Sequence, residues 1–159
     1  MENKMRKRLI FLAQAAIIAA LYAAVTILFA PISYLQVQVR VSEALTVLPA
    51  FTPAAIPGLF IGCVIANIFG GVGMLDIIFG SLATLAAAFL SYKMPKKYLV
   101  PLPPVILNGI IVGATLSYEY NLPLLETMLW VAVGEAAACY ILGYILLVRL
   151  DKYKDRIFK

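Results

Sequence analysis

The stretch "LIFLAQAAIIAALYAAVTILFA" (residues 9–30) decides the fold class, because it runs for 22 positions without a charged residue. A helix needs about 20 apolar residues to cross the hydrocarbon core of a bilayer. The apolar part of a cleaved signal peptide is shorter, about 7–15 residues. We therefore expect residues 9–30 to form a retained transmembrane helix.

The composition extends this prediction to the whole chain. Of its 159 residues, 64% are hydrophobic and only 13% are charged. A water-soluble domain of this length has about a quarter of its residues charged, and its core could not bury so much apolar surface. The length suggests one domain. We predict an integral membrane protein with a single domain spanning residues 1–159.

Further apolar runs follow, separated by proline-rich, glycine-rich and charged breaks. They predict an all-α protein with six transmembrane helices, at roughly residues 9–30, 41–53, 54–69, 75–92, 99–118 and 124–150. The second and third runs are short and contain prolines. Such segments often lie near transport sites, although a kinked structural hairpin fits the pattern equally well.

The basic residues fix the predicted orientation. Of the 13 lysines and arginines, all but Arg40 lie before the first run, in the break at residues 93–97, or after the last run. Six crossings bring these three clusters to one side of the membrane. Because basic clusters stay in the cytoplasm, we expect both termini to be cytoplasmic and Arg40 to lie outside, at the end of a loop of residues 31–40.

Several classes of function lack their motifs. The chain has no histidine, no G-x-x-x-x-G-K-[ST] phosphate loop and no G-x-S-x-G elbow. Its basic clusters are short flanks of apolar runs, which do not make a nucleic-acid-binding face. Cys63 and Cys139 are isolated within apolar runs and are predicted to be small buried residues without a disulfide. We expect neither an enzyme nor a metal site.

The few polar residues inside the apolar runs are candidates for function, since ionisable groups are costly in a membrane. Glu135 is the clearest, deep in the last run, and it needs a hydrogen-bond donor from the protein or from a ligand. Asp76 can instead cap the helix that begins there. Arg40 and Glu43 can pair with each other or contact a ligand. The amides of Asn67 and Asn108 complete the set.

Alanines recur every fourth residue in the first run and form two adjacent stripes. One stripe is Ala15, Ala19 and Ala23, and the other is Ala16, Ala20 and Ala24. Small residues let another helix approach closely in lipid. The partner helix can belong to the same protein or to another subunit.

Residues 38–88, "QVRVSEALTVLPAFTPAAIPGLFIGCVIANIFGGVGMLDIIFGSLATLAAA", resemble the QueT family of queuosine-precursor transporters. The likeness is strongest in "RVSEALTVLP", "GCVIAN" and "DIIFGSLATL". The resemblance implies a bacterial plasma-membrane protein that serves as the substrate-binding S component of an energy-coupling-factor (ECF) importer. Such a subunit works with a transmembrane coupling subunit and two ATPase subunits. ATP and Mg²⁺ are used by those ATPases, and no cofactor is expected in this chain.

The resemblance also implies roles for particular residues. The alanine stripes become the docking face for the coupling subunit, and residues 31–40 become a lid over the substrate. The implied substrate is a 7-deazaguanine such as 7-aminomethyl-7-deazaguanine or queuine. A carboxylate can accept both N–H donors of its base edge, and a cationic aminomethyl group favours a second carboxylate. Because the ring lacks N7, an arginine cannot use its usual two-pronged contact with O6 and N7.

We therefore expect a site of carboxylates and amides in which Glu135 recognises the base. Arg40 would donate to O6 or hold Glu43, and one aromatic ring would stack on the base. The expected residues are Glu135, Asn108, Asn67, Asp76, Glu43 and Arg40, with Tyr34, Tyr118 or Trp130 as the ring. The alternatives are an S component for another vitamin-like micronutrient, a self-sufficient secondary transporter in which Glu135 and Asp76 relay protons, and a structural membrane protein.

Overall fold

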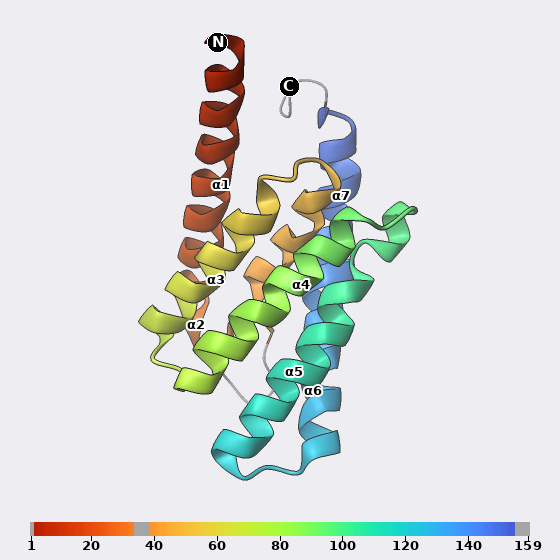
Figure 1. The fold of residues 1–159 in the computed structure, drawn as a ribbon. Helices are drawn as coiled ribbons and strands as arrows, with labels where there is room; N and C mark the ends of the chain where they lie inside the picture. The colour runs from red at the N-terminus through yellow and green to blue at the C-terminus, as the bar shows by residue number, and fades with distance from the viewer. Residues whose placement is uncertain (1, 34–38, 155–159) are drawn as a thin grey trace.

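The computed structural model describes residues 2–33 and 39–154, and every regular element in these ranges is helical (Figure 1). The all-α prediction is confirmed for this part of the chain. The elements are α1 (Glu2–Leu28), α2 (Ala30–Ser33), η1 (Val41–Ala50), α3 (Ala55–Gly70), η2 (Asp76–Gly80), α4 (Ser81–Tyr92), η3 (Lys97–Leu99), α5 (Leu102–Tyr120), α6 (Leu124–Ala136), η4 (Ala137–Gly143) and α7 (Tyr144–Asp151).

Three continuous helical stretches are long and apolar enough to cross a membrane. They are Asn3–Leu28, Lys97–Tyr120 and Leu124–Asp151. Three shorter apolar helices lie one after another between the first and the second of these stretches, at Val41–Ala50, Ala55–Gly70 and Asp76–Tyr92. These six segments follow the six predicted runs in order, and the number that cross the bilayer stays a prediction.

Helices η1 and η4 are two of the described elements that depart from regular α geometry; η2 is also π-helical and η3 is also a 3₁₀ helix. The second predicted run is a tight 3₁₀ helix, η1, which ends at Ala50 directly after Pro49. Runs of 3₁₀ helix longer than a few residues are uncommon, and they often mark strain or a hinge. The last run widens into π-helical turns at Ala137–Gly143, which begin two residues after Glu135. Both η1 and η4 lie beside the polar residues described below.

The basic segments gather at one end of the bundle (Figure 1). The first turns of α1, the α4–α5 connection and the last turn of α7 lie there, and the turns after α3 and α5 lie at the opposite end. Left-handed residues Gly71 (φ 66°) and Asn121 (φ 52°) make those two turns. The arrangement agrees with the side-of-membrane assignment made from charge.

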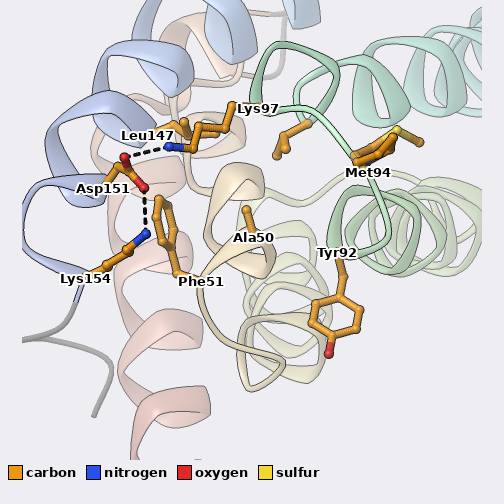
Figure 2. Close-up of a pocket in the computed structure, with 10 residues that line it drawn as sticks. Ala50, Phe51, Tyr92, Met94, Lys97, Leu147, Asp151 and Lys154 are labelled. Atoms are coloured by element: carbon orange, nitrogen blue, oxygen red, sulfur yellow. Dashed lines mark hydrogen bonds and ion pairs between the residues drawn. The ribbon is translucent and has the colours of Figure 1, made fainter.

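A cavity of about 200 Å³ opens at this basic end, beside the last turn of η1. Figure 2 shows Asp151 joined to Lys97 at 2.6 Å and to Lys154 at 3.5 Å on its rim. The Lys97–Asp151 pair ties α7 to η3, the short helix between α4 and α5, while the Lys154–Asp151 pair is local to the end of α7.

Helix η1 lies in the middle of the bundle, in contact with α1, α3, α4, η4 and α7. Most of its side chains are buried, including the polar Ser42, Glu43 and Thr46. The outside of the bundle is strongly apolar. The polar side chains of η1 lie instead in the interior of the bundle, where neighbouring helices shelter them from lipid.

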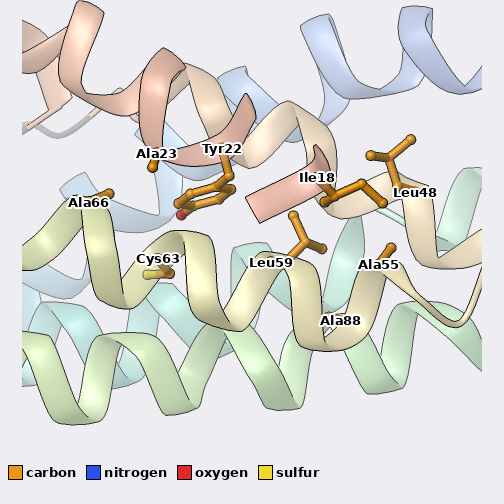
Figure 3. Packing of buried hydrophobic residues seen from close by; sticks show 9 residues of the cluster. All are labelled: Ile18, Tyr22, Ala23, Leu48, Ala55, Leu59, Cys63, Ala66 and Ala88. Carbon is orange, nitrogen blue, oxygen red and sulfur yellow. The ribbon is translucent and has the colours of Figure 1, made fainter. Parts of the chain in front are cut away.

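Helices α1 and α3 pack closely because small residues face each other. Figure 3 shows the buried cluster between them, with Ile18 and Tyr22 of α1 against Leu59 and Cys63 of α3. A Cβ placed on Gly62 would lie 2.8 Å from the backbone oxygen of Ala19. This contact explains why glycine is required at position 62.

The packing separates the two alanine stripes. The stripe Ala15, Ala19 and Ala23 is 5–7% exposed and faces α3, while the stripe Ala16, Ala20 and Ala24 is exposed on the outside of α1. Burial removes the first stripe from any surface that a partner subunit could reach. Only the second stripe stays a candidate for docking.

We expect the Gly62→Ala variant to be less stable, because its new methyl group must push α3 away from Ala19. Overpacking of this kind costs about 1–3 kcal/mol, which thermal unfolding in detergent measures. The control is Ala20→Leu on the exposed stripe, where a surface change stays within about 0.5 kcal/mol. Equal melting temperatures for Gly62→Ala and the wild-type protein would contradict the close α1–α3 contact.

Candidate substrate-binding site

Six of the predicted polar residues are buried in the middle of the bundle. They come from the segment before η1, from η1 itself and from α3, η2, α5 and α6. They are Arg40 (2% exposed), Glu43 (0%), Asn67 (0%), Asp76 (0%), Asn108 (1%) and Glu135 (4%). Residues far apart in the sequence thus form one polar region inside an apolar helical bundle.

Arg40 and Asp76 form one end of this region. The Arg40 guanidinium lies 3.8 Å from the Asp76 carboxylate, and its Nη1 lies 3.8 Å from Cys63 Sγ. Asn67 Nδ2 donates to the backbone oxygen of Asp76 at 3.2 Å. Asp76 therefore faces a buried cation, and no side-chain capping bond is found at the start of η2. This arrangement disfavours the capping alternative for Asp76.

Glu43 is held by helix α1. The Tyr22 hydroxyl donates a hydrogen bond to Glu43 Oε1, and Thr26 Oγ1 donates to Ser42 Oγ at 2.6 Å. These two bonds attach the first turn of η1 to α1. Sequence reasoning missed both Tyr22 and Thr26, although two hydroxyls four residues apart on an otherwise apolar helix need partners.

Glu135 approaches Glu43 from helix α6. The Cys139 thiol lies 3.7 Å from Glu135 Oε2 and 3.5 Å from the Glu43 backbone oxygen. Ligand atoms of Glu43, Glu135 and Cys139 all lie within 4.8 Å of one another. The side chain of Asn108 is within hydrogen-bonding reach of both carboxylates. These groups form a second end of the polar region, and they are close enough together to share one small cation.

The polar region has more hydrogen-bond acceptors than donors. Six buried side-chain oxygens have no hydrogen-bond partner among the described residues; one is the hydroxyl of Ser81, and the other five belong to the polar region. These five are Glu43 Oε2, Asn67 Oδ1, Asp76 Oδ1, Asp76 Oδ2 and Asn108 Oδ1. Buried polar atoms in proteins are nearly always paired, and leaving one unpaired costs about 1–3 kcal/mol. The site is therefore suited to a ligand rich in N–H donors.

Acidic side chains also outnumber basic side chains in the polar region. Glu43, Asp76 and Glu135 are acidic, and Arg40 is the basic residue among the buried side chains that the structure describes. A buried carboxylate needs a cation, a proton or several donors to be stable. Since Arg40 sits beside Asp76, the Glu43–Glu135 end has the greater need for a proton or a cation.

The comparison with known families identifies the family of the chain. Residues 12–152 match the sequence profile described as QueT transporter. The chain belongs to the QueT transporter family. This membership confirms the resemblance seen in residues 38–88 and indicates a membrane transporter for a queuosine precursor. The searches of curated proteins and of solved structures found no match.

The two aromatic candidates for stacking that the structure describes, Trp130 and Tyr118, do not lie in the buried polar region. Trp130 is 49% exposed and Tyr118 is 77% exposed, on the outer surfaces of α6 and α5. Tyr34 lies outside the described residues. The buried ring beside the carboxylates is that of Tyr22, which the sequence analysis did not single out.

We expect Arg40→Met to destabilise the protein strongly, because it leaves Asp76 buried without its cation. Removing one partner of a buried ion pair costs about 3–5 kcal/mol. The double variant Arg40→Met/Asp76→Leu should recover much of this loss, and a double-mutant cycle of unfolding free energies measures the coupling. Additive single-variant effects, with no coupling, would show that the 3.8 Å pair contributes nothing.

Proposed function

We propose that this protein is the substrate-binding S component of an ECF importer for a 7-deazaguanine precursor of queuosine. Family membership supports a queuosine-precursor transporter. The acceptor-rich buried region supports a donor-rich ligand of this kind. In this proposal the chain crosses the bacterial plasma membrane six times, with both termini cytoplasmic, in line with the basic residues at one end of the bundle.

The Arg40–Asp76 end suits the base itself. A guanine-type edge presents one acceptor, O6, beside two donors, the ring N–H and the amino group. Within residues 2–33 and 39–154, neither carboxylate oxygen of Asp76 has a hydrogen-bond partner, and the two can accept these N–H groups together. Arg40, 3.8 Å away, donates to O6. This assignment gives Asp76 the role that the sequence analysis gave to Glu135, and Asn67 adds a further acceptor beside it.

The segment before η1 is proposed to control access. Arg40 and Glu43 lie at the start of η1, directly after the predicted outer loop of residues 31–40. Substrate contacts by Arg40 would therefore couple binding to the position of this loop. The lid itself and stacking by Tyr34 stay predictions, because residues 34–38 lie outside the described part of the chain.

Transport is proposed to require docking through the exposed stripe of Ala16, Ala20 and Ala24. The stripe offers a flat, small-residue face on α1, which lets a helix of the coupling subunit approach closely in lipid. ATP and Mg²⁺ are used by the two partner ATPases. A self-sufficient secondary transporter is the second candidate, favoured by the close carboxylates Glu43 and Glu135, which could relay protons.

Calorimetry on the purified protein tests the proposed substrate. We expect 7-deazaguanines to bind, and Asp76→Asn to weaken them about 10–150-fold, which corresponds to about 1.5–3 kcal/mol for bonds to a charged acceptor. Glu126→Gln is the matched control, because Glu126 is an exposed carboxylate at the start of α6. Tight binding of an unrelated vitamin, without binding of any deazaguanine, would contradict the proposal.

Uptake measurements on the Ala20→Leu variant distinguish the ECF importer from the secondary transporter. We expect this variant to bind substrate normally but to import none when it is produced with the coupling subunit and ATPases, since the larger side chain prevents close docking. Ala19 is not suitable for this test because it is buried against α3. Uptake by the wild-type chain without the coupling module, abolished by an uncoupler, would favour the secondary transporter.

A further inference from the structure

The proposed recognition of the base by Arg40 and Asp76 leaves three polar side chains of the polar region unused. They are the carboxylates of Glu43 and Glu135 and the amide of Asn108. Glu43 Oε2 and Asn108 Oδ1 are buried acceptors that have no hydrogen-bond partner in the part of the chain that the structure describes. Glu135 lies beside them, within the 4.8 Å group that also contains Glu43 and Cys139. Asn108 is 1% exposed and lies within hydrogen-bonding reach of both carboxylates, and its own buried oxygen has no partner among the described residues, which indicates a missing donor.

The surroundings of the two carboxylates determine what they can hold. The titratable and charged groups that face them are the phenol of Tyr22, the guanidinium of Arg40 and the thiols of Cys63 and Cys139. Arg40 is the cation in this set, and it lies beside Asp76. Two carboxylates this close in a buried site cannot both be charged without a proton or another cation between them.

We propose that Glu43, Glu135 and Asn108 form a subsite for a positively charged amino group of the substrate. An ammonium group has three N–H donors, and this subsite has three acceptors, Glu43 Oε2, Asn108 Oδ1 and the Glu135 carboxylate. The inference rests on the proposed function and specifies its substrate class as a cationic 7-aminomethyl-7-deazaguanine. A neutral analogue would leave these acceptors unpaired.

The charge balance of binding follows from this arrangement. Before binding, the two carboxyl groups share one proton and carry a net charge of −1. The ammonium group brings +1 and occupies the position of the shared proton, which leaves for solvent. The two carboxylates then carry −2 beside the bound +1, so the subsite again has a net charge of −1. One proton is released for each substrate bound, and no bond in the substrate changes.

Competition between the proton and the substrate makes affinity depend on pH. An aliphatic amine stays protonated up to about pH 10, so the charge of the ligand is constant at pH 6–8. Where the shared proton must leave, the affinity for the cationic ligand falls about tenfold for each unit that the pH is lowered. The neutral ligand displaces no proton, and its affinity stays constant over the same range.

The experiment compares two ligands that differ in charge, 7-aminomethyl-7-deazaguanine and 7-cyano-7-deazaguanine. Calorimetry on the purified wild-type protein, in two buffers with different ionisation enthalpies, gives both the affinities and the protons released. We expect the aminomethyl compound to bind at least about 100-fold more tightly than the cyano compound, because it forms several charge-assisted hydrogen bonds. It should release about one proton, and the cyano compound none.

Glu135→Gln provides the second measurement, with Glu126→Gln as its exposed control on the same helix. The melting temperature in detergent verifies the fold of the variant, and its affinity for the cyano compound should change much less than its affinity for the aminomethyl compound. Its preference for the aminomethyl compound should fall below about fivefold, since a neutral amide cannot supply the charge. Asp76→Asn, by contrast, should weaken both ligands by a similar factor.

Three outcomes would overturn the subsite. Equal wild-type affinities for the two ligands, without proton release, would refute it while leaving the proposed function intact. Equal weakening of both ligands by Glu135→Gln would assign that residue to the base instead. If Zn²⁺, added alone, binds through Glu135 more tightly than the aminomethyl compound does, then these residues form a metal site. Failure of both deazaguanines to bind the wild-type protein would refute the proposed function itself.

Discussion

The burial of Arg40 among acidic side chains is the constraint on which the rest of the structure depends. A guanidinium and three carboxylates cannot face lipid, because the bilayer supplies neither charge nor hydrogen bonds to them. They are placed on and around η1, which five neighbouring elements enclose. The 3.8 Å contact from Arg40 to Asp76 ties the start of η1 to η2, and the Tyr22–Glu43 bond ties it to α1.

Small residues make this enclosure possible. Lipid gives helices little hydrophobic reason to associate, so close van der Waals contact has to hold the bundle together. A Cβ on Gly113 would lie 2.6 Å from the Met128 Cα, and one on Gly109 would lie 2.9 Å from the Ala132 Cβ. The α5–α6 pair is therefore as close as backbones permit. That contact brings Asn108 of α5 close to Glu135 of α6 inside the protein.

The sequence predicted the helices better than it predicted the site. Apolar runs and their proline and glycine breaks located six helical segments, because helix length and burial in lipid are set locally. Burial of Glu43, Asp76 and Glu135 followed from the cost of charge in a membrane. Their partners did not follow, since Arg40–Asp76 and Tyr22–Glu43 are contacts between different helices. The 3₁₀ form of η1 and the π turns after Ala136 also depend on packing that no local pattern encodes.

The alanine stripes show the same limit. Spacing of four residues made the two stripes equivalent, and only the position of α3 distinguishes them, with Ala19 against Gly62 and Ala20 exposed. The aromatic residues of the site were also not predictable from the sequence pattern. Trp130 looked suitable for a binding site by its type, but it lies half exposed on α6. The buried Tyr22 is the ring that contacts a carboxylate.

An experimental structure with bound 7-aminomethyl-7-deazaguanine tests the central claim most directly, which is that the unpaired buried oxygens bind the substrate. The account predicts the base edge against Asp76 and Arg40, and the amino group between Glu43, Asn108 and Glu135. A ligand bound elsewhere, for example in the cavity beside Lys97 and Asp151 at the basic end, with the five oxygens of the polar region still unpaired, would contradict it.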